Sequence, residues 1–229
     1  MKEIIQIMGM TNRYFLSIFC CFLTWAAFGQ KNKSDDFRLR TDVTVKHDLS
    51  KKWNISGQFQ TRWYDNLNDF KGFYYTLGCA YEPIPNLTIK PEVRLFTSTS
   101  IDYLRWGLFA DYKHKIAKNS LSLRLGYTEE LDGVVWGDFD LESNQIMGRG
   151  KLEYQHRLTK KLFGIVSSEL YFDLSDGMEL SRIRNFLGAE YKFSKKIAAE
   201  ILWMYQPMFK KSTHTHNIFA IQAGLTFKI

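Results

Sequence analysis

Apolar and polar residues alternate along most of the chain, and the alternation is clearest in residues 217–229. Six apolar side chains in this segment share one parity, whereas Gln222, Gly224, Thr226 and Lys228 share the other. A period of two over this length is typical of a β-strand with one apolar and one polar face. The segment therefore predicts a strand at the boundary between an apolar and a polar environment.

The same alternation recurs in ten segments before this one. The predicted strands are 37–49, 53–64, 72–82, 87–97, 103–114, 120–130, 146–158, 162–174, 182–193, 196–206 and 217–229. Their length exceeds the mean of about 5 to 6 residues for soluble sheets and fits strands that cross a membrane at a tilt. Single-chain bacterial barrels usually have an even number of strands. Either residues 131–145 hide another strand or the first segment is incomplete, so we expect 10 to 12 strands.

The connections between these segments alternate in length. Short ones are 50–52, 83–86, 117–119, 159–161 and 194–195, and longer ones are 65–71, 98–102, 131–145, 175–181 and 207–216. Short turns at one rim and longer loops at the other are typical of outer-membrane barrels. This order favours a barrel over a soluble sandwich.

Charged residues fall almost entirely on one parity. Within the predicted strands the apolar parity carries a single charged residue, Glu129, and the opposite parity carries 28. A Lys or Arg facing lipid at mid-bilayer costs about 2 to 4 kcal/mol, so the charged parity is expected to face the lumen. A soluble ligand-binding barrel needs the reverse, but the apolar parity is too bulky for a small cavity. We predict an all-β fold, an antiparallel transmembrane β-barrel of 10 to 12 strands with a polar, charged lumen.

Residues 14–28 form an uninterrupted apolar run that follows Arg13. The run is shorter than the roughly 20 residues of a membrane helix and ends in small residues, which predicts a signal peptide over 1–29 and a barrel over 30–229. Export leaves Cys79 as the single cysteine, so no internal disulfide is expected. An exported chain has no nucleic acid to bind, so the net charge of +7 does not indicate a nucleic-acid partner. The expected location is the cell outer membrane, and the expected partners are outer-membrane lipid and the barrel assembly machinery.

Three segments repeat one arrangement of Arg, Gly, Glu and Tyr. They are 105–113, which begins RWG and ends DYK, 149–161, which contains RGKLEY and TKK, and 182–196, which contains RIR and GAEYKFSKK. With SELYF at 168–172 they resemble the domain of unknown function 2490 family, outer-membrane barrels common in the Bacteroidota. The resemblance implies a fold and a location. That family has no assigned activity, so it implies no catalytic residues, and the chain departs from the usual barrel ending because Ile229 replaces a terminal aromatic residue.

Charged residues on the lumen parity are the candidate functional site. Glu169 and Asp173 lie on one predicted strand, and Arg182 and Arg184 lie on the next. Buried charges of both signs are most simply explained by a paired network, and a solute path lined by the same arginines is the alternative. The predicted lumen-charge network consists of Arg105, Arg124, Arg149, Glu169, Asp173, Arg182, Arg184 and Glu190.

Catalysis receives little support from the sequence. His156 and Ser168 share a parity on neighbouring predicted strands, as in outer-membrane lipid hydrolases, but no carboxylate of that parity orients the histidine. His214 and His216 have a spacing that suits adventitious metal, without further ligands nearby. We expect a non-enzymatic protein without cofactor or metal.

The function expected from the sequence is that of a small outer-membrane β-barrel, which is structural or passes small solutes through a narrow charged lumen. An outer-membrane lipid-modifying enzyme and a soluble periplasmic ligand-binding barrel are the alternatives. The identity of any solute is beyond the sequence.

Overall fold

A computed structural model describes residues 35–98, 102–135, 138–175, 177–207 and 217–229. The signal peptide predicted over 1–29 and the histidines at 214 and 216 lie outside these ranges. No helix in the described part of the chain could span a membrane. The strands are β1 Asp36–Asp48, β2 Trp53–Tyr64, β3 Asp69–Ile84, β4 Leu87–Thr97, β5 Asp102–Ile116, β6 Asn119–Val135, β7 Asp138–Arg157, β8 Leu162–Asp173, β9 Glu179–Lys192, β10 Ile197–Gln206 and β11 Ile218–Lys228.

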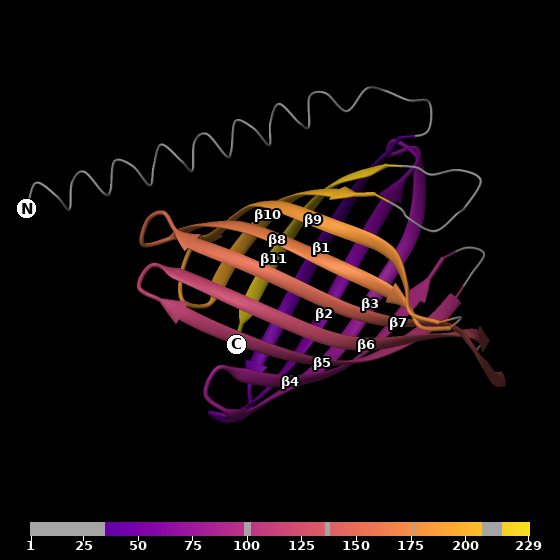
Figure 1. Ribbon diagram of the computed structural model, residues 1–229, viewed down its shortest axis with the longest axis horizontal. Coiled ribbons are helices and arrows are strands. Elements are labelled where there is room, and N and C mark those ends of the chain that lie inside the picture. Colours follow the sequence, from indigo (N-terminus) through magenta and orange to yellow (C-terminus); the bar gives the residue numbers. More distant parts are fainter. Residues whose placement is uncertain (1–34, 99–101, 136–137, 176, 208–216) are drawn as a thin grey trace, which may run out of the picture. The chain divides into compact units, whose positions relative to one another are not determined.

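The eleven strands close into one barrel, in which each strand pairs with its neighbours in sequence and β1 pairs with β11 (Figure 1). This confirms the predicted all-β barrel of 10 to 12 strands. The prediction of a wholly antiparallel barrel was wrong, because β1 and β11 run parallel from Asp36 opposite Ile218 to Lys46 opposite Lys228. Strands joined by hairpins alternate in direction, so the first and last of an odd number must point the same way.

The described residues of the segment 131–145 belong to β6 and β7, which corrects both readings of this segment, as an additional strand and as a long loop. They continue the β6–β7 hairpin, in which Val134 pairs with Phe139 and Val135 with Asp138. The pairing shifts twice below the tip, so the hairpin carries β-bulges that the alternating pattern does not reveal. The two strands of this hairpin are therefore longer than predicted.

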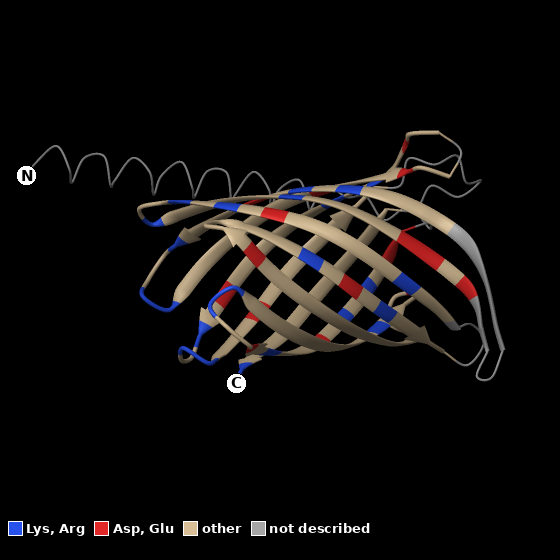
Figure 2. Ribbon diagram, turned by 90° about the horizontal axis from the view of Figure 1, so that it is seen from below, with Lys and Arg blue, Asp and Glu red and all other residues tan. Residues whose placement is uncertain are grey.

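Three of the short turns share one construction. In each, a hydroxyl group accepts hydrogen bonds from the backbone N–H groups two and three residues later: Ser50 from Lys52 and Trp53, Thr159 from Lys161 and Leu162, and Ser194 from Lys196 and Ile197. A hydroxyl that caps the turn in this way fixes a short connection between strands. The turns expose pairs of lysines, which Figure 2 shows as blue segments at this end of the barrel.

Apolar side chains cover the outside of the barrel. Leu77 is 72% exposed, Ile201 63% and Leu125 59%, although each lies in the middle part of its strand. Their neighbours of opposite parity point inward, and the lumen side chains Arg40 and Glu169 are each only 4% exposed. The charged parity thus faces the lumen, in the direction that the sequence pattern predicts.

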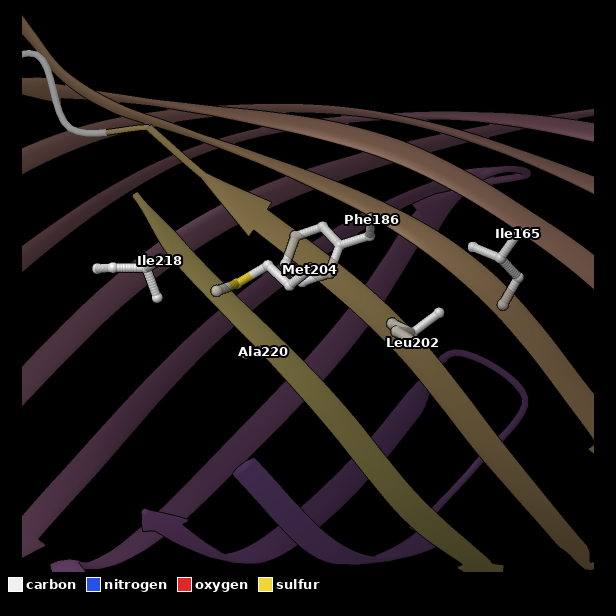
Figure 3. Close-up of a cluster of buried hydrophobic side chains, with 6 residues drawn as sticks. All are labelled: Ile165, Phe186, Leu202, Met204, Ile218 and Ala220. Carbon is white, nitrogen blue, oxygen red and sulfur yellow. The ribbon is translucent and has the colours of Figure 1, made fainter. Parts of the chain in front are cut away.

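The lumen is nevertheless not polar throughout, which corrects the expected interior. Six buried side chains on β8 to β11 form an apolar cluster on the inner wall: Ile165, Phe186, Leu202, Met204, Ile218 and Ala220 (Figure 3). At Gly188 an added Cβ would collide with the backbone of the adjacent β10, so a glycine is needed there. The cluster shares β8 and β9 with Glu169, Arg182 and Arg184, which occupy other positions along these strands.

Candidate functional site: the charged lumen

Exposure of the lumen charges is greater near the rim with the short turns than in the middle of the barrel. Near the turns, the Lys192 side chain is 45% exposed and the Arg124 side chain 33%. Farther along, the Arg149 side chain is 12% exposed and the Glu169 side chain 6%. The lumen is therefore open to water at the turn end and shielded from water around Arg149 and Glu169, a region that we call the narrow part.

Tyr171 on β8 connects the charged residues of the narrow part. Its hydroxyl donates a hydrogen bond to Glu169 Oε2 (2.8 Å) and accepts from Arg149 Nη2 (3.1 Å) and Arg184 Nη1 (2.6 Å). The Arg149 Nη2 group also pairs directly with Glu169 Oε1 at 2.6 Å. Charge-assisted bonds of this kind are about twice as strong as neutral ones and fix the four groups relative to one another.

Guanidinium groups also lie over the ring of Tyr171. The Cζ atoms of Arg182, Arg184 and Arg149 lie 4.5, 4.6 and 4.8 Å from the ring centroid. Contacts of this geometry are worth about 0.5 to 2 kcal/mol each, depending on how far the cation is desolvated. A single tyrosine thus gathers three arginines from β7 and β9 beside Glu169.

Arg105 on β5 contacts two carboxylates from neighbouring strands. Its guanidinium lies 3.7 Å from Glu92 on β4 and 3.8 Å from Glu130 on β6. These separations are long for hydrogen bonds, and the Nη2 atom of Arg105 is buried without a hydrogen-bond partner in the described chain. The contact is therefore an electrostatic one between partly buried charges.

Arg124 forms a separate pair nearer the turn end. Its Nε and Nη2 atoms bind the two oxygens of Asp111 at 2.5 and 2.8 Å. The Phe109 ring lies between this pair and the Tyr171 group, with the Cζ atoms of Arg124 and Arg149 at 5.4 and 5.1 Å from its centroid. The Phe109 ring packs against the backbone of β6 at Gly126, where an added Cβ would overlap the ring.

The structure therefore divides the predicted network. Arg105, Arg149, Glu169, Arg182 and Arg184 lie in the narrow part of the lumen, whereas Arg124 pairs with Asp111 below it. Asp173 accepts a hydrogen bond from the Ser175 backbone N–H, near the loop end. Glu190 pairs with Lys192 at 3.2 Å, near the turn end. In the register of β8 and β9, Glu169 lies opposite Arg184.

Sequence reasoning did not single out three further arginines of the narrow part. Arg40 on β1 is almost fully buried. Arg62 on β2 lies 3.8 Å over the Tyr74 ring, and Arg94 on β4 donates to Thr76 Oγ1 at 2.8 Å. All three are on the charged parity. They are far from β8 and β9 in the sequence, so the sequence did not indicate that closure of the barrel brings them into the same part of the lumen.

The proximity suggested for His156 and Ser168 is wrong. Ser168 pairs with Leu152 and His156 with Gly164, so the two residues are four positions out of register. At about 3.3 Å per residue this is an offset of about 13 Å along the strands. His156 Nδ1 instead contacts Asn119 Oδ1 at 2.6 Å. Within the described ranges, no three His, Cys, Asp or Glu side chains are grouped as a metal site.

The fold and the site define a closed all-β barrel with an apolar exterior and a lumen lined by ion pairs. The chain belongs to the family described as protein of unknown function (DUF2490), whose model matches residues 37–217. No curated protein matches the chain. A similar solved structure is described as "Unveiling the Mechanism Behind the in-meso Crystallization of Membrane Proteins"; it is 15% identical, with a TM-score of 0.39 over 78% of this chain and 85% of that one.

Proposed function

We propose that the protein is an outer-membrane β-barrel whose narrow, charged lumen admits small solutes. One observation carries the proposal: the barrel is closed, and its exposed outer wall is apolar while its inner wall is charged. A soluble barrel would gain by placing charges outside, whereas a barrel in lipid requires the observed arrangement. The family membership supports the fold and assigns no activity.

Aromatic residues on the outer wall lie at heights that suit the two membrane interfaces. Trp53 stacks on Tyr81 near the turns, with ring centroids 4.4 Å apart, and Trp63 packs against Phe70 near the loops, with centroids 5.1 Å apart. Ten residues separate the two tryptophans, which is about 33 Å along the strand and about 23 Å along the axis at a tilt of about 45°. This matches the apolar band of about 25 Å between the aromatic girdles of known barrels.

Exposed lysines at the turns complete this picture. Lys51, Lys160 and Lys195 and the lysine that follows each of them lie on three capped turns at one rim. Lysines at such a rim can reach lipid phosphates while the strand below remains in hydrocarbon. The short turns would then face the periplasm, as in other outer-membrane barrels.

The lumen supports passage of small solutes more than of large ones. Its turn end carries water-exposed ion pairs such as Lys151–Glu153 at 2.7 Å, but Phe96 and Met204 are at most 1% exposed and occupy space farther inside. A path with charged walls and filled sections selects by size and charge. A purely structural barrel is the second form of the proposal, since the same side chains could close the lumen.

Fractionation and planar-bilayer recording test the proposal in two steps. The protein should remain with the outer-membrane fraction and require detergent for extraction. Recovery of the folded protein in the soluble fraction without detergent would refute the membrane assignment. In planar bilayers, discrete conductance steps would support passage of solutes, whereas an inserted but silent barrel would refute passage and leave the structural form.

Neither alternative function gains from the geometry. The lipid-modifying enzyme loses its suggested pair, because His156 and Ser168 are out of register. The soluble ligand-binding barrel requires an apolar interior, yet side chains as apolar as Leu77 and Leu125 face outward. The observations therefore favour the membrane barrel.

A further inference from the structure

Seven arginines form a ring around the narrow part of the lumen. They are Arg40, Arg62, Arg94, Arg105, Arg149, Arg182 and Arg184, which we call the arginine ring, and they come from β1, β2, β4, β5, β7 and β9. Four of them lie close enough to feel the positive charge of other ring members: Arg40 that of Arg184 and Arg62, Arg94 that of Arg62 and Arg105, Arg105 that of Arg149, and Arg182 that of Arg149 and Arg184.

Carboxylates within the ring do not balance these charges. Asp42, Glu92, Glu130 and Glu169 are the carboxylates whose charges act on the ring arginines in the described chain. Four carboxylates against seven guanidinium groups leave an excess of three positive charges. Like charges held together away from bulk water repel strongly, because the local dielectric is lower than that of water.

The rest of the lumen shows that such an excess is not a general property of this barrel. Toward the turns, Arg124 is paired with Asp111, Lys151 with Glu153 and Lys192 with Glu190, at 2.5 to 3.2 Å. Each of these three cations has its own carboxylate. The arginine ring differs from them, because its seven arginines share a smaller number of carboxylates.

Hydrogen bonding in the ring is also incomplete. The Nε–H groups of Arg40 and Arg182 are buried and have no hydrogen-bond partner in the described chain. Arg40 as a whole residue is only 4% exposed. A buried charged donor without an acceptor is costly, and the cost disappears when an anion supplies the acceptor. The unpaired donors and the positive excess occur on the same residues and call for the same ligand.

We propose that the arginine ring binds a small soluble oxyanion that carries two or more negative charges, such as a phosphate or a polycarboxylate. Guanidinium groups match the planar, two-oxygen edge of these anions and remain charged at any physiological pH. The anion enters from the water-exposed turn end and stops where the lumen narrows. This proposal names the class of solute for the passage proposed above, but it requires only the closed barrel and holds whether or not the lumen conducts.

Binding to the purified mature barrel in a zwitterionic detergent tests the proposal. Inorganic phosphate and citrate are titrated at constant ionic strength against chloride, while calorimetry and the unfolding temperature are recorded. Both anions should bind saturably and raise the unfolding temperature more than chloride does. Arg40→Gln and Arg182→Gln should each weaken phosphate binding about ten-fold or more, as expected for loss of one charge-assisted hydrogen bond.

Arg124→Gln is the matched control, because Arg124 is a lumen arginine that has its own carboxylate. It should keep the phosphate affinity of the wild type. Without added anion, Arg40→Gln should raise the unfolding temperature by relieving repulsion, whereas Arg124→Gln should lower it by stranding Asp111.

Phosphate and citrate effects no larger than that of chloride would overturn the proposal. Equal weakening by all three variants would overturn it as well, since general lumen charge would then explain binding. Neither result would affect fractionation or conductance, so failure of the anion site can be distinguished from failure of the membrane barrel.

Discussion

Replacing Leu77 with lysine tests whether the outer wall of the barrel faces lipid or water. Leu77 is 72% exposed and lies opposite Gly57 and Val93 on the neighbouring strands. It is seven residues from Ile84 at the turn end of β3, which is about 16 Å along the axis at a tilt of about 45°. The side chain therefore projects near the middle of the proposed apolar band.

At that depth Leu77→Lys should destabilise the barrel by about 2 to 4 kcal/mol, which is about one and a half to three orders of magnitude in the folding equilibrium. In water the same change at so exposed a position would alter stability by no more than about 0.5 kcal/mol. Equilibrium unfolding in urea from lipid vesicles, followed by tryptophan fluorescence and by band shift on unheated gels, measures the difference.

Leu49→Lys is the control for this experiment. Leu49 is 57% exposed and lies beside the capped turn at Ser50, where a lysine can reach the interface and should cost about 0 to 1 kcal/mol. Equal stabilities of the Leu77→Lys and wild-type proteins would refute the lipid-facing assignment. A penalty of the same size at both sites would also refute it, because the cost should depend on depth.

Two further changes test the interior and the closure of the barrel. Gly126→Val should destabilise the protein by about 1 to 3 kcal/mol, because an added Cβ would overlap the Phe109 ring. Gly150→Ala should have little effect, because the nearest atom to an added Cβ there is 4.0 Å away. Urea unfolding measures both variants, and equal losses of stability would contradict the packing around Phe109. Cysteines at Val43 and Leu225, which are opposite each other in the parallel pair, should form a disulfide that changes mobility on denaturing gels, and preferential cross-linking of a pair offset by two residues would contradict the register.

The alternating pattern was sufficient to place all eleven strands, because each strand has two faces of different chemistry. β2 and β4 begin and end where the pattern predicts. The extension of β6 and β7 was not predicted, since pairing beyond Glu130 is irregular and lacks a clean alternation. The parallel contact of β1 with β11 was also missed, because it depends on the parity of the strand number and not on any local signal.

The candidate site was predicted less completely than the fold. Parity was enough to assign Arg149, Glu169 and Arg184 to the lumen, and adjacency in sequence suggested their grouping. Parity gives no height along the barrel axis, so it could not show that Arg40 on β1 lies close enough to Arg184 on β9 for their charges to interact. The role of Tyr171 as their common contact requires side-chain positions that only the folded barrel supplies.

The side of the wall that touches hydrocarbon can be measured directly by spin labelling of β6. Single labelled cysteines at residues 121 to 125, in a protein whose Cys79 is replaced by Ala, are reconstituted in vesicles and exposed to oxygen, which partitions into lipid, or to a water-soluble nickel complex. The account predicts high oxygen accessibility at Leu121, Leu123 and Leu125, with the intervening labels shielded from lipid. Preferential contact of those three labels with the nickel complex would contradict it.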